Sequence, residues 1–225
     1  MSVSSELTAL ADSIRTKSGA TAKLGIATMK TAVDGIETYD PFAGFEMLKT
    51  LQYASGAPDK KFAASVPQCI SLGSAFSACS EELDVELTTT TNLRNLENFA
   101  YNSKIKTIKF IGTTERVTTF ARFAANASNL TSVKNLNFSY ATNAGLAFSG
   151  ASALTEIEIV AGTIEISISF ADSPSLSDAS IQSIVDGLTD LTGSTAQTLT
   201  LHTDVKAKLT EEQTAAVTAK NWTLA

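Results

Sequence analysis

The stretch AFSGASALTEIEI (147–159) contains the pattern that decides the fold of this chain. Phe148 is followed by a short run of small residues, then by Leu154, and then by an alternating run in which Ile157 and Ile159 are separated by glutamate. Alternation of apolar and polar residues at a period of two is typical of a strand with one buried side. The stretch therefore predicts a tight turn followed by a half-buried strand.

The same pattern recurs along the chain. A Phe returns at intervals of 23, 24, 25 and 22 residues, at Phe76, Phe99, Phe123, Phe148 and Phe170. An aliphatic residue follows each Phe six or seven positions later, at Leu83, Ile105, Leu130, Leu154 and Leu176. In the first four repeats this residue belongs to an alternating run: LDVEL, IKTIKF, LTSVKNL or LTEIEI. Because one repeat cannot bury its Phe alone, whereas stacked repeats can, the period predicts a solenoid.

Three segments follow from this period. Residues 71–176 are expected to form the solenoid, 41–70 a linker and N-terminal cap, and 177–225 a C-terminal cap. In this last segment Ile181, Ile184 and Leu188 recur at helical spacing, TAQTLTL predicts a strand, and a second helix is expected from Thr210, followed by a short final strand from Asn221. A cap is needed because an open solenoid end exposes apolar core and an unpaired strand.

The apolar pattern of residues 1–40 predicts two short helices, which we expect to serve as an anchoring segment. Apolar residues recur at helical spacing in two stripes: Leu7, Leu10 and Ile14, then Met29, Val33 and Ile36. Helices of this length are marginal alone in water, so we expect them to pack on a sister chain or on another protein. Arg15 is either a docking residue of this segment or a cation favoured by a helix C-terminus.

Composition and charge exclude several classes of protein. The chain has 17 Lys and Arg against 23 Asp and Glu, a net charge of -6, and nucleic-acid binding would need clustered cations. No run of ~18 apolar residues occurs, so we expect no membrane insertion. Glu6, Asp12 and Arg15 interrupt the region where a signal peptide needs an apolar run, which predicts synthesis in the cytoplasm without an export signal.

The residues offer little of the chemistry that an enzyme needs. The chain has no GxSxG, no Walker loop and no GxGxxG. Cys69 and Cys79 lack the His or CxxC spacing of a metal site, and they either pair or are small buried residues. The single histidine, His202, follows a strand-like run and is interpreted as structural or surface-exposed. We expect no catalytic residue, no metal and no cofactor.

The predicted strands place four charged residues at one equivalent outward position. They form an expected Glu-Lys-Lys-Glu column with a spacing of ~4.8 Å: Glu86, Lys109, Lys134 and Glu158. The column is either a solvated, charge-paired face or a polar platform for a glycan or a protein. Tyr101 and Tyr140, near the repeat turns, are the candidates for exposed aromatic contacts.

The repeat pattern, clearest in 147–159, resembles the leucine-rich repeats of bacterial surface antigens. That resemblance covers about residues 70–176 and implies parallel strands stacked along one side of a solenoid. The C-terminal run from Ser175 looks like the closing segment of such proteins encoded in phage genomes. LTALADSIRTKSG (7–19) resembles a helical segment at the start of phage tail and virion proteins, with Ser13 where that segment usually has Ala.

These observations predict an α+β protein: a short N-terminal helical segment, then a leucine-rich-repeat solenoid with stacked parallel strands, then an α/β C-terminal cap. Its expected function is that of a phage virion structural protein, a tail, fibre or surface-displayed component. It would bind other virion proteins through the N-terminal segment, and a host-surface glycan or protein through the repeats. Virion symmetry favours a homo-oligomer. A bacterial cell-surface adhesin and a carbohydrate-active enzyme are the alternatives.

Overall fold

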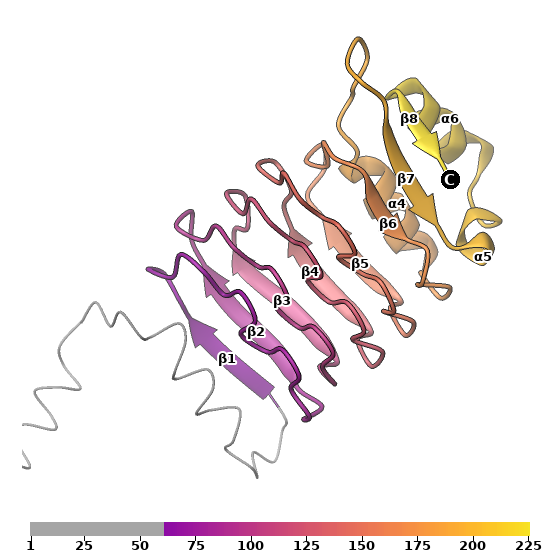
Figure 1. Ribbon diagram of the computed structural model, residues 1–225. Coiled ribbons are helices and arrows are strands. Elements are labelled where there is room, and N and C mark those ends of the chain that lie inside the picture. Colours follow the sequence, from indigo (N-terminus) through magenta and orange to yellow (C-terminus); the bar gives the residue numbers. More distant parts are fainter. Residues whose placement is uncertain (1–60) are drawn as a thin grey trace, which may run out of the picture. The chain divides into compact units, whose positions relative to one another are not determined.

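The computed structural model describes residues 61–225 of the chain. In this range five parallel strands form one sheet in the order β1-β2-β3-β4-β5 (Figure 1). Its strands are β1 (Lys61–Ser65), β2 (Asp84–Thr89), β3 (Thr107–Gly112), β4 (Ser132–Leu136) and β5 (Glu156–Ile159). The predicted helical segment 1–40 and most of the predicted linker 41–70 lie outside the described residues.

Each strand after β1 coincides with one of the predicted alternating runs. Successive strands pair with partners one repeat away, so that Val85 lies opposite Ile108, and Ile108 opposite Val133. These three side chains are at most 1% exposed. The prediction of stacked parallel strands is confirmed over 84–159.

Strand β1 was not expected from the sequence. Its run, KFAAS, has one large apolar residue, Phe62, and Pro67 follows two positions after the strand ends. A five-residue strand with so weak an alternation gains its order from pairing, here with Asp84–Thr88 of β2. The sheet therefore begins inside the segment that the sequence assigns to a linker.

The repeating Phe side chains form a buried column between the sheet and the turns. Ring centroids of successive residues lie 5.2, 5.5, 5.9 and 4.9 Å apart along Phe76, Phe99, Phe123, Phe148 and Phe170. Phe62 extends the column, 5.3 Å from Phe76. At these separations aromatic pairs add ~0.5–1.5 kcal/mol each beyond the burial of their surface. The predicted Phe core is confirmed.

A second ladder of backbone hydrogen bonds joins the repeats on the side of the turns. There every second N–H group donates to a carbonyl oxygen of the next repeat. The N–H groups of Leu72, Ser74, Phe76 and Ala78 bond to the carbonyls of Asn95, Glu97, Phe99 and Tyr101 at 2.8–2.9 Å. The same arrangement recurs from 96–102 to 119–125 and from 120–126 to 143–149. Each repeat is therefore held to its neighbour on two sides.

The turns use left-handed backbone conformations at two positions in each repeat, both at a spacing of 24 residues. The first set has φ between 50° and 60° at Ser74, Asn98, Arg122 and Leu146, and the second between 52° and 71° at Ala78, Asn102, Asn126 and Gly150. A side chain in this conformation costs ~1–2 kcal/mol. The inter-repeat hydrogen bonds offset that cost, so the turns form with glycine at only one of the eight positions.

The C-terminal segment forms a smaller sheet with helices packed beside it (Figure 1). Three parallel strands pair in the order β6-β7-β8: β6 (Ile168–Phe170), β7 (Gln197–Leu201) and β8 (Trp222–Leu224). The helices are α4 (Asp178–Gly187), α5 (Thr203–Lys206) and α6 (Glu211–Ala219). The two predicted helices and the two predicted strands of this segment are confirmed, whereas α5 and β6 were not predicted.

Helix α4 covers the free edge of β5. The hydroxyl oxygen of Ser180 accepts the N–H of Ile157 at 2.9 Å, and that of Ser183 accepts the N–H of Ile159 at 2.9 Å. Ser180 also donates to the carbonyl of Thr155 at 3.0 Å. An unpaired strand edge is a template for pairing with another chain. Here the hydroxyl oxygens of two serines accept the N–H groups that β5 would otherwise offer to another strand.

Replacing Ser180 with Ala should destabilise this edge. Ser180 is 3% exposed, so the substitution leaves the Ile157 N–H buried without an acceptor, at a cost of about 2 kcal/mol. Urea unfolding should show that loss, and amide exchange at Ile157 should accelerate. Ser175→Ala, at an exposed serine just before α4, is the matched control, with a change below about 0.5 kcal/mol. Equal effects of the two changes would contradict this role of Ser180.

Gly112 should tolerate no side chain. At φ +100° an added Cβ would lie 2.3 Å from the carbonyl oxygen of Thr89, which is part of the ladder between β2 and β3. We expect Gly112→Ala to lower the free energy of unfolding by about 3 kcal/mol. Gly162→Ala is the matched control, since φ is +67° there but nothing lies within 4 Å of the added atom, and about 1 kcal/mol is expected. Equal losses would show that only the backbone conformation matters.

Candidate binding surface

The exposed side of β2–β5, called here the sheet face, presents two polar columns. Register places Glu86 opposite Lys109 and Lys109 opposite Lys134, so the predicted column is confirmed over these three strands. A second column runs beside it through Asp84, Thr107, Ser132 and Glu156. Each column places one side chain per repeat.

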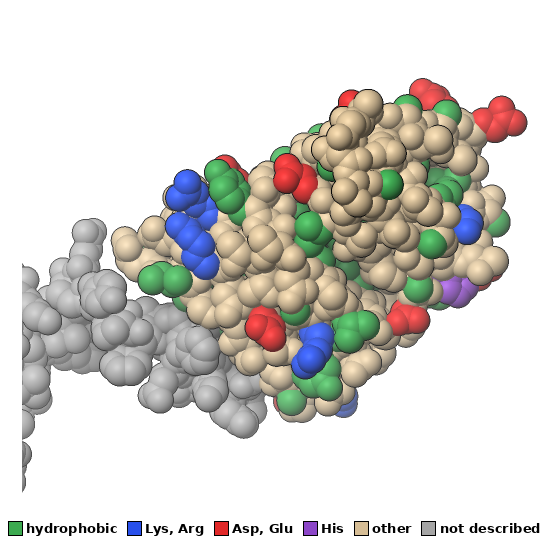
Figure 2. All heavy atoms as spheres, turned by 45° about the horizontal axis from the view of Figure 1, so that its top comes forward, with side chains coloured by type: hydrophobic (Ala, Val, Ile, Leu, Met, Phe, Trp, Pro, Cys, Tyr) green, Lys and Arg blue, Asp and Glu red, His purple; other side chains and the backbone are tan. Residues whose placement is uncertain are grey.

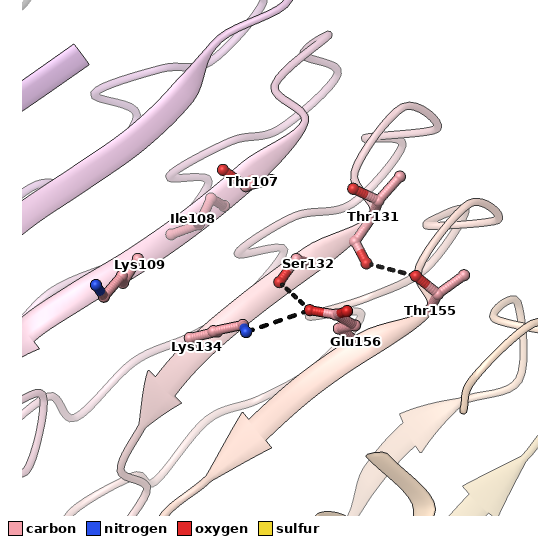
Figure 3. A pocket seen from close by; sticks show the side chains of 8 residues that line it. All are labelled: Thr107, Ile108, Lys109, Thr131, Ser132, Lys134, Thr155 and Glu156. Atoms are coloured by element: carbon pink, nitrogen blue, oxygen red, sulfur yellow. Dashed lines mark hydrogen bonds and ion pairs between the residues drawn. The ribbon is translucent and has the colours of Figure 1, made fainter. Parts of the chain in front are cut away.

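The predicted fourth member, Glu158, follows the first column across a bulge, because this one residue of β5 lies opposite both Lys134 and Asn135 of β4. The register between β4 and β5 shifts between Val133 and Leu136. Asn135 lies at this shift with φ 64°, and its side-chain amide donates to the carbonyls of Phe110 and Gly112 at 3.1 and 3.0 Å. The Nζ of Lys134 consequently lies 3.3 Å from the carboxylate of Glu156 (Figure 3).

Charges on the sheet face are paired across strands. The carboxylate of Glu86 lies 3.6 Å from Lys61 and 3.5 Å from Lys109. Lys61 comes from β1, which was not predicted as a strand, and it lies opposite Asp84, so its ion pair with Glu86 was not predicted either. On the face drawn in Figure 2, charged side chains stand singly or in small groups among uncharged ones.

A hollow of about 460 Å³ lies on the sheet face over β3, β4 and β5 (Figure 3). It is lined by Thr107, Ile108, Lys109, Thr131, Ser132, Lys134, Thr155 and Glu156. The hydroxyl of Thr155 donates to the carbonyl of Thr131, and that of Ser132 donates to Glu156. These oxygens are left as acceptors, while Lys109 and Lys134 supply donors. The hollow therefore suits hydrogen bonding to a polar partner.

Glu156 and Glu158 both line a smaller hollow of about 320 Å³ beside α4. They lie two residues apart on β5, so both are on the same side of the strand. Glycoside hydrolysis needs two carboxyl groups that flank the scissile bond. Both carboxylates are therefore candidates for contact with a ligand in this hollow.

The two tyrosines differ in exposure. Tyr140 is 50% exposed, and the guanidinium of Arg116 lies 5.5 Å from the centre of its ring. Such a cation–π pair is available to a partner on the surface. Tyr101 is half-buried, and its backbone carbonyl belongs to the turn-side ladder. Of the two predicted contact residues, Tyr140 is therefore the better exposed.

Cys69 and Cys79 are free thiols. Burial raises the pKa of the Cys69 thiol, which donates a hydrogen bond to the carbonyl of Ser71 at 3.0 Å. Cys79 is 1% exposed and packs in the core. The two cysteines are therefore unpaired, and of the two only Cys79 is fully buried, while Cys69 is partly buried against the core.

His202 has a local structural role. Its Nδ1 accepts the N–H of Asp204 at 3.1 Å and so caps the N-terminus of α5. Within residues 61–225 no group of three His, Cys, Asp or Glu side chains is placed to hold a metal ion. No helix in the same range is long and apolar enough to cross a membrane. The anchoring residues predicted between Leu7 and Ile36 lie outside the described part of the chain.

The charge pairs should contribute little to stability. The Glu86 side chain is 27% exposed and those of Lys61 and Lys109 are about half exposed, so solvent screens their attraction. Glu86→Gln should change the free energy of unfolding by less than about 1 kcal/mol, measured by urea denaturation at low and high salt. A loss above about 2 kcal/mol would show that the pairs are needed for folding, and the sheet face would then be a weaker candidate for binding.

Comparisons of the chain with protein-family models, with curated proteins and with solved structures find no match. Its function is therefore argued from its own residues.

Proposed function

We propose that this chain is a structural protein of a phage particle, a tail, fibre or surface-displayed component. Its repeats would form a leucine-rich-repeat solenoid that binds a protein or a host-surface glycan. The segment 1–40 would attach the chain to other virion proteins or to sister chains. The chain would act as a binding module rather than as an enzyme.

The two flanking segments support placement in a particle. LTALADSIRTKSG (7–19) resembles the helical start of phage tail and virion proteins, and the run from Ser175 resembles the closing segment of phage-encoded repeat proteins. Virion components are assembled in symmetric sets, which favours a homo-oligomer. These resemblances concern the two ends of the chain and support its placement in a particle. The repeats between them support the binding role.

The sheet face is the observation that carries the binding role. Its polar side chains repeat once per strand on a backbone that is hydrogen-bonded on both sides, so their spacing is held rigidly. A rigid surface loses little conformational freedom when a partner binds. Its fixed arrangement of acidic and basic side chains favours a partner with a complementary pattern and disfavours others.

Detection of the chain in purified particles would test its placement. Mass spectrometry of particles released from cells that carry the gene should identify peptides from both ends of the chain, at a level comparable to that of other structural proteins. Deletion of residues 1–40 should leave the repeats folded, as judged by circular dichroism, but absent from particles. Incorporation of the truncated chain would contradict the anchoring role.

Absence of the intact chain from particles would overturn the proposal. Recovery from the bacterial cell envelope would favour the adhesin. Turnover of a defined glycan that is lost in Glu156→Gln and Glu158→Gln would favour the carbohydrate-active enzyme.

A further inference from the structure

The turn side of the repeats contains a buried hydroxyl group that has no partner. Residues at one position in successive repeats, 24 apart, are Cys79, Ser103, Ala127 and Ala151, and each is at most 3% exposed. Ser103 is the only one of the four with a hydroxyl group. Its Oγ is the only fully buried side-chain nitrogen or oxygen in residues 61–225 without a hydrogen-bond partner.

This hydroxyl costs free energy that the neighbouring repeats avoid. A buried polar atom without a partner loses its hydrogen bonds to water and gains none in return. Ala127 and Ala151 show that a residue without any polar atom fits the equivalent place. The position of Ser103 is therefore unfavourable unless a group from outside the chain completes its hydrogen bonds.

Ser103 lines a hollow of about 330 Å³, called here the turn groove. Three successive repeats supply its walls: Ala78, Cys79 and Ser80, then Asn102, Ser103 and Lys104, then Asn126, Ser128 and Asn129. Asn102 and Asn126 occupy left-handed positions, with φ of 52° and 59°. Both are exposed, and neither side-chain amide makes a hydrogen bond within the described residues. Two amides that can donate and accept thus stand one repeat apart beside the buried hydroxyl.

Lys104 adds a cation to the turn groove. Its side chain forms no ion pair within residues 61–225, unlike Lys106, whose Nζ lies 2.8 Å from Glu82. The groove therefore offers amide groups, hydroxyls and one ammonium group, and no aromatic ring among its lining residues. Groups that both donate and accept match a ligand whose own groups do the same, and sugar hydroxyls are of this kind.

We propose that the turn groove binds one sugar ring of a saccharide. Adjacent hydroxyl groups of the ring would bond to the side-chain amides of Asn102 and Asn126, and one would bond to the Ser103 hydroxyl, which would have to turn toward the groove from its buried position. Lys104 would donate to a ring or substituent oxygen. This inference rests on the binding role proposed above and assigns to it a ligand class and a second surface, away from the sheet face. It does not depend on placement in a virion.

The decisive experiment compares stability with binding in the full-length chain. Ser103→Ala should leave the Tm unchanged or raise it, because it removes an unpaired polar atom, yet it should weaken saccharide binding at least tenfold. Ser173→Ala is the matched control. Ser173 is also fully buried, but its hydroxyl donates to the carbonyl of Ala151 at 3.1 Å, so its loss should lower the Tm without changing binding.

Binding would be measured by titration calorimetry and by chemical shifts of the Asn102 and Asn126 side-chain amides. The probes are the methyl glycosides of glucose, galactose and N-acetylglucosamine, together with glucuronic acid. Asn102→Gly keeps the left-handed backbone while removing the amide, and it should also weaken binding at least tenfold. A preference for glucuronic acid that Lys104→Met abolishes would show that the groove binds acidic saccharides. Equal binding of all four probes would show that the charge of the saccharide does not contribute.

Two results would overturn the proposal. If Ser103→Ala lowers the Tm as much as Ser173→Ala does, the Ser103 hydroxyl already has a hydrogen-bond partner in the free protein, such as a bound water, and needs no ligand. If none of the four probes binds in a saturable manner that Ser103→Ala weakens, the groove is not a saccharide site. Either failure leaves the detection of the chain in particles unaffected, so the two proposals are tested separately.

Discussion

The stacking of each repeat on the next is the interaction on which the rest of this structure depends. Two hydrogen-bond ladders, one between strands and one between turns, join residues about 24 positions apart, and the Phe column fills the space between them. Because both ladders must close at once, the number of residues in each repeat can vary only slightly. The intervals of 22 to 25 residues between successive Phe show this limit.

A stack of this kind must end, and the chain ends it with side chains rather than with another strand. Ser180 and Ser183 of α4 accept the outward N–H groups of β5, and the next strand, β6, turns to a separate sheet with β7 and β8. The helix protects an edge that would otherwise pair with another chain. The repeats between 61 and 159 are thereby left with a finite, ordered surface.

That surface presents side chains in two different settings. On the sheet face, Lys109, Lys134 and Glu156 are exposed and paired, so they add little to folding and remain available to a partner. In the turn groove, Ser103 is buried and unpaired, which opposes folding. A residue that costs stability points to a ligand more directly than exposed charges do, and for that reason the saccharide inference rests on the groove.

The sequence by itself determined the period, the Phe core, the strands from 84 to 159, and α4, α6, β7 and β8 after 177. These depend on apolar spacing within one repeat, which is visible along the chain. Only the tertiary structure decided that Lys61–Ser65 is a strand, that Lys134 forms an ion pair with Glu156, and that Ser103 lacks a partner. Each of these depends on what a neighbouring repeat places opposite the residue. The register shift at Asn135 and the left-handed turns without glycine arise from contacts between repeats, and a pattern read along one chain does not contain them.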